Sequence, residues 1–108
     1  MNSQTADVLV IGAGVVGCAV AFELASSGRR VTVVDMRRPG AGASQASAGI
    51  LAPYVEGHHS KALRTLGLHS LDIYPGFVAR VVERAGVAVE YREAGTLEIA
   101  VTPEDVTR

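Results

Sequence analysis

A glycine-rich turn near the start of the chain constrains the fold more than any other feature of the sequence. The turn consists of Gly12-Ala13-Gly14-Val15-Val16-Gly17. It joins a short β-branched run at residues 7–11 to an apolar stretch with helical spacing. The run before the turn has the β-branched composition of a buried parallel strand. A second run of this kind covers residues 31–35, and Gly28 stands where a helix commonly ends. This order predicts a right-handed βαβ unit.

Each glycine of the turn has a distinct physical role in such a unit. Gly12 permits the tight turn out of the strand, and Gly17 lets the helix lie close against the sheet. Gly14 lacks a Cβ, so a pyrophosphate can approach the backbone there. Free amides around Val15 and Val16, together with the positive end of the helix dipole, would then hold the phosphates. The motif therefore predicts a dinucleotide site.

The acidic residue that ends the second run, Asp35, narrows the choice of dinucleotide. Its carboxylate is placed to accept hydrogen bonds from both ribose hydroxyls of an adenosine. It would also repel a 2′-phosphate, which disfavours NADP. Arg37 and Arg38 follow one residue later, after Met36, and are interpreted as solvated surface residues. The glycine motif and Asp35 leave both NAD and FAD open.

The charge balance and the single cysteine limit the partners and the compartment. Ten Lys and Arg residues against eleven Asp and Glu residues give a formal net charge of -1 over 108 residues. The basic residues are scattered, so we expect neither a nucleic-acid partner nor a membrane surface. The apolar run at residues 8–22 is shorter than the roughly 20 residues of a membrane span. One cysteine cannot form an internal disulfide, and we expect a cytoplasmic protein.

The remainder of the chain predicts a small-residue loop, a helix and a hairpin. Residues 39–53 are almost all Gly, Ala, Ser or Pro, which favours a loop packed against something large and flat over a flexible linker. Apolar residues spaced by three and four from 63 to 85 predict one helix, or two that meet at Pro75. Residues 87–91 and 96–101 predict an antiparallel hairpin. Thr102 to Asp105 has the composition of a helix start.

Together these elements predict an α/β fold that is incomplete. We expect a Rossmann-like FAD/NAD(P)-binding βαβ unit, followed by a helix and the first antiparallel hairpin of a substrate domain. The proposed boundary separates residues 1–57, the dinucleotide-binding unit and its loop, from residues 58–108, which begin the substrate domain. Two parallel strands need neighbours and helices on both faces to bury their apolar surface. We therefore interpret the chain as the N-terminal piece of a longer protein.

Two stretches of sequence resemble one enzyme family. Residues 7–35, followed by Ala43-Ser44-Gln45-Ala46-Ser47-Ala48-Gly49-Ile50-Leu51-Ala52-Pro53, resemble the FAD-dependent D-amino-acid oxidase superfamily, and within it the glycine oxidases of thiamine biosynthesis. The second stretch is more specific than the glycine motif. The resemblance covers nearly the whole chain but only the opening part of a family member.

The resemblance implies FAD as the cofactor and adds residues to its site. Ala43 and Ser44 would contact the ribose and diphosphate region, and Met36 would lie in the cofactor site beside Asp35. Ala48, Gly49 and Ile50 would pass close to the isoalloxazine. The resemblance also explains why the side chains of this segment are small, because bulky side chains would displace the flavin.

The reaction implied by the resemblance is oxidative deamination of a small amino-acid or amine substrate. A hydride passes from the substrate Cα to the flavin, the imine hydrolyses to a keto acid and ammonia, and O2 is reduced to H2O2. We assign no catalytic residue and no metal ligand within residues 1–108, and the remainder of the protein's own chain must supply the substrate contacts. A homo-oligomer is left open.

Several alternatives remain at this stage. Sarcosine oxidase, D-amino-acid dehydrogenase and glycerol-3-phosphate dehydrogenase belong to the same superfamily. An NAD-dependent dehydrogenase and a dinucleotide-binding module without catalysis are the further alternatives.

Overall fold

The computed structural model describes residues 5–56, 60–97 and 99–103. The chain forms two compact units, Met1–Gly49 and Ile50–Arg108. The first unit contains β1 (Val8–Ile11), α1 (Val15–Ser26), β2 (Val31–Val34) and the single-turn helix α2 (Ala43–Ala46). The second contains α3 (Pro53–Glu56) and α4 (Lys61–Ala85). This division between residues 49 and 50 is one of packing. The functional boundary between residues 57 and 58 stays a prediction.

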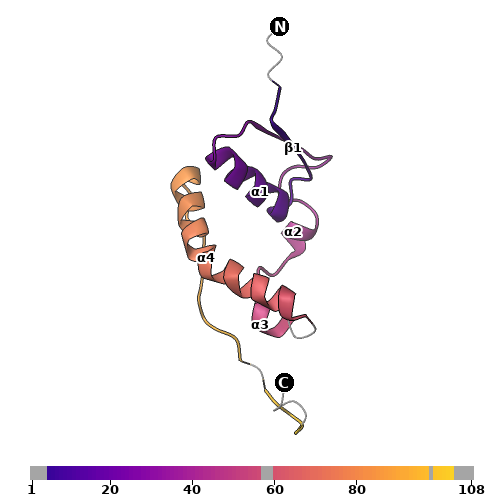
Figure 1. Cartoon of the computed structure of the whole chain (residues 1–108), viewed down its shortest axis with the longest axis vertical. Coiled ribbons are helices and arrows are strands. Elements are labelled where there is room, and N and C mark those ends of the chain that lie inside the picture. The colour runs from indigo at the N-terminus through magenta and orange to yellow at the C-terminus, as the bar shows by residue number, and fades with distance from the viewer. Residues whose placement is uncertain (1–4, 57–59, 98, 104–108) are drawn as a thin grey trace. The chain divides into compact units, whose positions relative to one another are not determined.

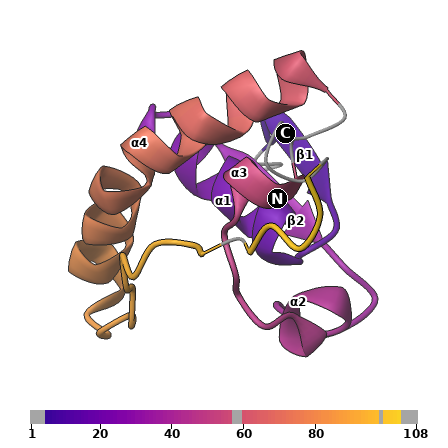
Figure 2. The ribbon, with the colours of Figure 1, turned by 90° about the horizontal axis from the view of Figure 1, so that it is seen from below.

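The first unit is the predicted βαβ unit (Figure 1). Strands β1 and β2 pair in parallel, with Val8 opposite Val31 and Ile11 opposite Val34. Helix α1 connects them along one face of this two-stranded sheet (Figure 2). The predicted strands and helix are therefore confirmed, with strand ends within one residue of those expected.

The N-terminal end of the parallel strand pair is fixed by a helix cap and an ion pair. At the C-terminus of α1, Gly28 adopts a positive φ of 85°, its amide donates to the Ala25 carbonyl, and the Arg29 amide donates to the Leu24 carbonyl. These two bonds form a Schellman motif, which ends the helix and turns the chain into β2. Arg30 then forms a two-pronged ion pair with Asp7, at 2.7 Å and 3.2 Å, just before β1 begins.

The two faces of the sheet have different surroundings. On one face, Gly17 of α1 lies so close to β1 that an added Cβ would be 3.4 Å from Val10 Cγ1. The side chains that alternate to the other face, Leu9 and Ile11, are exposed, Ile11 to 83%. Among the described residues only Ala13 is a buried apolar residue. A sheet of this apolar composition with one open face agrees with the predicted incomplete domain.

The second unit is built on one long helix, as predicted from the apolar spacing. The hydroxyl of Ser60 caps the N-terminus of α4 by accepting from the Leu63 amide at 3.3 Å. Gly86 ends the helix in the left-handed conformation. The short helix α3 packs against α4, and a Cβ added to Gly67 would lie 2.7 Å from Pro53 Cβ. Gly67 therefore sets how closely α3 approaches α4.

Helix α4 is continuous through Pro75 and bends near its middle (Figure 2). Proline lacks an amide hydrogen, and its ring crowds the carbonyl four residues earlier, so it kinks a helix without always ending it. Of the two alternatives from the sequence, a single bent helix is therefore correct. Near the bend, the Tyr74 ring packs on the rings of Phe77 and Tyr91 at centroid distances of 5.9 Å and 5.3 Å.

The prediction of a hairpin with strands at residues 87–91 and 96–101 is wrong for the residues that the structure describes. Residues 87–97 and 99–101 form no strand. An isolated two-stranded hairpin is marginal in water, and the apolar side chains here are exposed, Leu97 to 88%. Tyr91 packs on α4 through Tyr74 instead of pairing in a ladder. Of the helix start predicted at Thr102 to Asp105, Glu104 and Asp105 lie outside the described residues.

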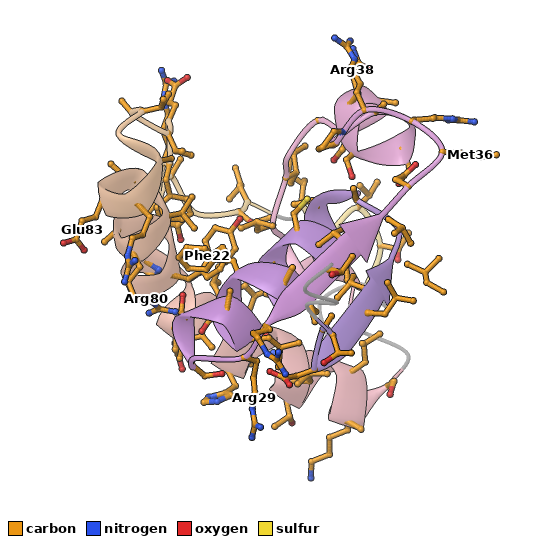
Figure 3. The ribbon with its side chains drawn as sticks, turned by 90° about the horizontal axis from the view of Figure 1, so that it is seen from above. Phe22, Arg29, Met36, Arg38, Arg80 and Glu83 are labelled. Atoms are coloured by element: carbon orange, nitrogen blue, oxygen red, sulfur yellow. The ribbon has the colours of Figure 1, made fainter. Side chains whose placement is uncertain are left out.

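Helix length alone does not make α4 a membrane span. With 25 residues the helix is long enough to cross a bilayer. Its charged residues are spread along it: Lys61, Arg64, Asp72, Arg80, Glu83 and Arg84. Figure 3 shows Arg80 and Glu83 pointing outward from the helix. Across the described part of the chain, no helix combines the length and apolar character of a transmembrane segment.

Candidate functional site

The glycine turn between β1 and α1 has the geometry that its sequence predicts. Gly12 has a φ of 105°, a region that L side chains rarely adopt. A Cβ on Gly17 would overlap the carbonyl oxygen of Gly12 and lie 3.0 Å from its carbonyl carbon. Gly12 thus allows the turn, and Gly17 allows α1 to start directly against the end of β1. The result is a helix N-terminus presented at the carboxyl end of the strand.

The amides at this N-terminus are the first functional groups of the site. Gly14 is the N-cap residue, and it supplies no side-chain cap. Within the described residues, the amides of Val16 and Gly17 have no acceptor outside the helix, and the first amides of a helix have none inside it. They therefore point outward, at the positive end of the helix dipole, a position that favours an anion.

Val15 differs from the free amide that the sequence predicts. Its N–H donates to the Oγ of Ser44, at 2.8 Å. The two residues are 29 positions apart, and Ser44 belongs to α2. A serine hydroxyl takes the place of the missing cap, because the N-cap residue is a glycine. The contact also explains in part why position 14 is a glycine, since a Cβ there would lie 3.1 Å from Ser44 Oγ.

Asp35 binds the same turn from the end of β2. One carboxylate oxygen accepts from the Ala13 amide at 2.7 Å, and the other accepts from the Arg37 amide at 2.8 Å. These two backbone donors, the Ala13 amide first, hold the pKa of Asp35 below its usual 3.8. The side chain is exposed and ionised at neutral pH. Each oxygen keeps a second lone pair, so the carboxylate is still able to accept from ribose hydroxyls.

The segment from β2 to α2 is therefore attached to the glycine turn at three points. Asp35 accepts from Ala13, the Gly40 amide donates to the Ala13 carbonyl at 2.7 Å, and Ser44 accepts from Val15. The sequence motif does not indicate the bonds from Gly40 and Ser44, which link positions 27 and 29 residues apart. The one signal for Ser44 is its hydroxyl within a run of small side chains.

The other predicted site residues lie further from these contacts or outside the first unit. Met36 is 93% exposed, and Figure 3 shows it at the outer edge of the segment that follows β2. Ala43 is the first residue of α2 and is exposed. Ala48 and Gly49 are also exposed, and the Gly49 amide donates to Ser47 Oγ at 3.1 Å. Ile50 begins the second unit.

The parts of the site define a class of protein. A strand, a glycine turn, outward amides at a helix N-terminus and an acidic residue that ends the next strand form a dinucleotide-binding βαβ unit. A family model described as "FAD dependent oxidoreductase" matches residues 7–108. The chain belongs to this family.

Glycine oxidases are among the most similar curated proteins. The chain is 36% identical over 99 residues to "Glycine oxidase" of Geobacillus kaustophilus (strain HTA426), covering 92% of this chain and 26% of that protein. It is 39% identical over 88 residues to "Glycine oxidase" of Pseudomonas aeruginosa, covering 82% and 24%. It is 37% identical over 94 residues to "Bifunctional protein ThiO/ThiG" of Trichormus variabilis, covering 87% and 14%.

A solved structure agrees with these relatives. The crystal structure of glycine oxidase from Geobacillus kaustophilus matches with a TM-score of 0.83 and 35% sequence identity, over 94% of this chain and 28% of that chain. The chain thus spans about a quarter of the length of the glycine oxidases that it matches. The predicted resemblance and the prediction of an incomplete Rossmann-like domain are confirmed.

Proposed function

We propose that this chain forms the FAD-binding part of an oxidoreductase that oxidises the CH–NH2 or CH–NH group of glycine or a small D-amino acid, with O2 as the acceptor. The observation that carries the proposal is the mouth of α1, the exposed N-terminal end formed by Gly14, Val16 and Gly17, with Asp35 bound beside it. Membership of an FAD-dependent family favours FAD over NAD. The glycine oxidases among the similar proteins favour an amino-acid substrate.

The mouth of α1 fits a diphosphate. Gly14 has no side chain, and among the described residues beyond its two chain neighbours only Ser44 Oγ would come within 4 Å of an added Cβ. The outward amides of Val16 and Gly17 supply two donors to phosphate oxygens, and the helix dipole adds a favourable potential. Gly14 therefore adds no side chain at the position expected for the diphosphate, and backbone donors lie beside it.

The acidic end of β2 fits the adenosine ribose. Asp35 is held by two backbone amides, which fixes the carboxylate in place before a ribose arrives. Its free lone pairs then accept from the two hydroxyls. Met36 would lie against the same nucleoside, and Ala43 and Ser44 would adjoin the ribose and diphosphate.

The segment after α2 fits the flavin end of the cofactor in composition. We assign Ala48, Gly49 and Ile50 to the isoalloxazine, because small or aliphatic residues let a flat ring lie close to the backbone. FAD supplies the hydride acceptor and the reaction with O2. The chain's own residues bind and orient the cofactor, and the rest of the protein must orient the amino acid.

The wider setting follows from the same proposal. The partners are a small amino-acid or amine substrate and the remainder of the protein. We place the enzyme in the cytoplasm, because a single cysteine suits a reducing compartment. A role in thiamine biosynthesis is part of this proposal, on the resemblance to glycine oxidases.

The proposed function is tested with the full-length protein. We expect bound flavin, seen as visible absorption bands, and H2O2 production that depends on glycine or a small D-amino acid. A colourless protein that reduces NAD would refute the choice of cofactor, and a flavoprotein that is inert toward amino acids and amines would refute the substrate class.

Gly14→Val tests the position of the diphosphate. The branched side chain would fill the mouth of α1, and we expect the purified protein to lose its flavin. Gly14 has an extended backbone, φ -73° and ψ 178°, so valine is compatible with its conformation. Gly76→Val is the matched control, because none of the described residues outside the helix backbone comes within 4 Å of a Cβ added there. Equal flavin content in the two variants would contradict the assignment.

A further inference from the structure

The ring of Tyr74 packs on two other aromatic rings of the second unit. Its centroid is 5.3 Å from that of Tyr91 and 5.9 Å from that of Phe77, and the planes of the two tyrosine rings are inclined at 50°. Tyr74 belongs to α4, and Tyr91 belongs to the segment at residues 87–97, in which no strand is described. Both tyrosines are half-buried. Two phenol side chains are therefore neighbours at a partly exposed position.

The Glu93 carboxylate gives this pair a proton acceptor. Partial burial raises the pKa of Tyr91 above its usual 10, and the charge of Glu93 and its hydrogen bond with Tyr91 raise the pKa further. Tyr91 is therefore a neutral phenol at physiological pH. A phenol that loses an electron becomes strongly acidic and must release its proton. A carboxylate that is already hydrogen-bonded to the phenol is placed to accept that proton.

We propose that Tyr74 and Tyr91 form an oxidative modification site, at which their two rings are joined covalently as a dityrosine. The oxidant is H2O2 acting through a haem peroxidase, which withdraws single electrons. Each tyrosine loses one electron and its phenolic proton, and Glu93 takes the proton of Tyr91. The two phenoxyl radicals form a carbon–carbon bond between positions ortho to their oxygens, and the two ring hydrogens at these positions move to the oxygens. In sum, two tyrosines and one H2O2 give one dityrosine and two waters.

Proximity favours this pair over the third tyrosine of the chain. Tyr54 belongs to α3 and is 50% exposed, so an oxidant reaches it more easily than the half-buried pair. Accessibility alone would therefore direct oxidation to Tyr54. Coupling, however, needs a second ring within reach, and a neighbouring ring acts as a partner at high effective concentration. The broad χ2 torsion of tyrosine lets the rings of Tyr74 and Tyr91 turn toward each other.

The experiment treats the full-length protein with H2O2 and a haem peroxidase and then digests it with trypsin. Trypsin cleaves after arginine, which places Tyr74 in the peptide 65–80 and Tyr91 in the peptide 85–92. We expect mass spectrometry to find these two peptides joined with the loss of two hydrogens, about tenfold more abundant than any link to Tyr54. Absence of the joined peptides would overturn the proposal, as would links to Tyr54 in equal amount.

Matched variants and an isotope mixture complete the test. Tyr74→Phe and Tyr91→Phe keep the aromatic ring and should abolish the link, whereas Tyr54→Phe should retain it. Glu93→Gln should form the link about tenfold more slowly, and an equal rate would remove Glu93 as the proton acceptor. In a mixture of ¹⁵N-labelled and unlabelled protein, links between labelled and unlabelled peptides would overturn the proposal, because they form between molecules. The peroxide is added, so the result does not depend on the proposed function, whose product is H2O2.

Discussion

Substitution of Gly17 by alanine tests how closely α1 is fitted to β1. In the structure, an added Cβ would overlap the Gly12 carbonyl oxygen and lie 3.0 Å from the carbonyl carbon. Both atoms belong to the backbone of the glycine turn, so neither moves away by a side-chain rotation. Val10 Cγ1, at 3.4 Å, closes the other side. Helix α1 must therefore shift from the sheet, or the turn must deform.

Two opposing free energies set the size of the effect. Alanine in place of glycine stabilises a helix by up to about 1 kcal/mol. Overpacking of a close contact costs typically about 1–3 kcal/mol and sometimes more. Because the overlap at Gly17 is with backbone, we take the upper end, about 3 kcal/mol. The net result is a loss of about 2 kcal/mol in the free energy of unfolding.

The comparison uses three glycines of the same chain. Gly76→Ala should stabilise the protein by about 0.5–1 kcal/mol, because in the described part of the chain the new Cβ meets no atom within 4 Å outside its own helix backbone. Gly67→Ala should fall between the other two, since its Cβ would meet Pro53 Cβ at 2.7 Å and α3 has only four residues to displace. The assay is urea unfolding of the full-length cofactor-free protein, with hydrogen exchange in β1 and α4 as local probes. A Gly17→Ala protein as stable as Gly76→Ala would refute the reasoning.

Three further predictions concern Asp35 and Ser60. Asp35→Asn should weaken FAD binding by about tenfold, because a charged acceptor is lost. Calorimetric titration of FAD into the full-length protein measures this affinity, and an unchanged affinity would remove Asp35 from the site. The pKa of Asp35 is lowered by the Ala13 and Arg37 amides, so its stabilising contribution is present above the ordinary 3.8 and is lost as pH falls through the lowered pKa. The difference in free energy of unfolding between the unchanged protein and Asp35→Asn should therefore shrink in acid. A difference that stays constant as the pH falls from neutral would contradict this. Ser60→Ala removes the N-cap of α4 and should lower the free energy of unfolding by about 1 kcal/mol in unfolding experiments. Ser70→Ala removes a hydroxyl that donates to the Leu66 carbonyl, and it should lower the free energy of unfolding by less. The reverse order would be evidence against the cap.

The βαβ unit is predictable because its determinants are local. Gly12 and Gly17 sit at fixed spacing in the turn, and each answers a backbone requirement that no other residue type meets. The apolar spacing of residues 63–85 predicts α4 for the same reason, since a helix repeats over its own neighbours in sequence. Such signals need no knowledge of distant contacts.

The parts that the sequence did not indicate depend on distant contacts. The Ser44 hydroxyl is paired with Val15 across 29 residues, and no local pattern specifies that partner. The apolar alternation at residues 87–101 favours a hairpin, but a ladder needs further strands beside it, and the described residues supply none there. Local preference predicts the type of element, and the long-range partners decide whether it forms.

A crystal structure of the full-length protein with FAD tests the central claim most directly. The predicted result is a diphosphate with oxygens within about 3.2 Å of the Val16 and Gly17 amides, and ribose hydroxyls on Asp35. A diphosphate held elsewhere, with the mouth of α1 open to solvent, would contradict the account.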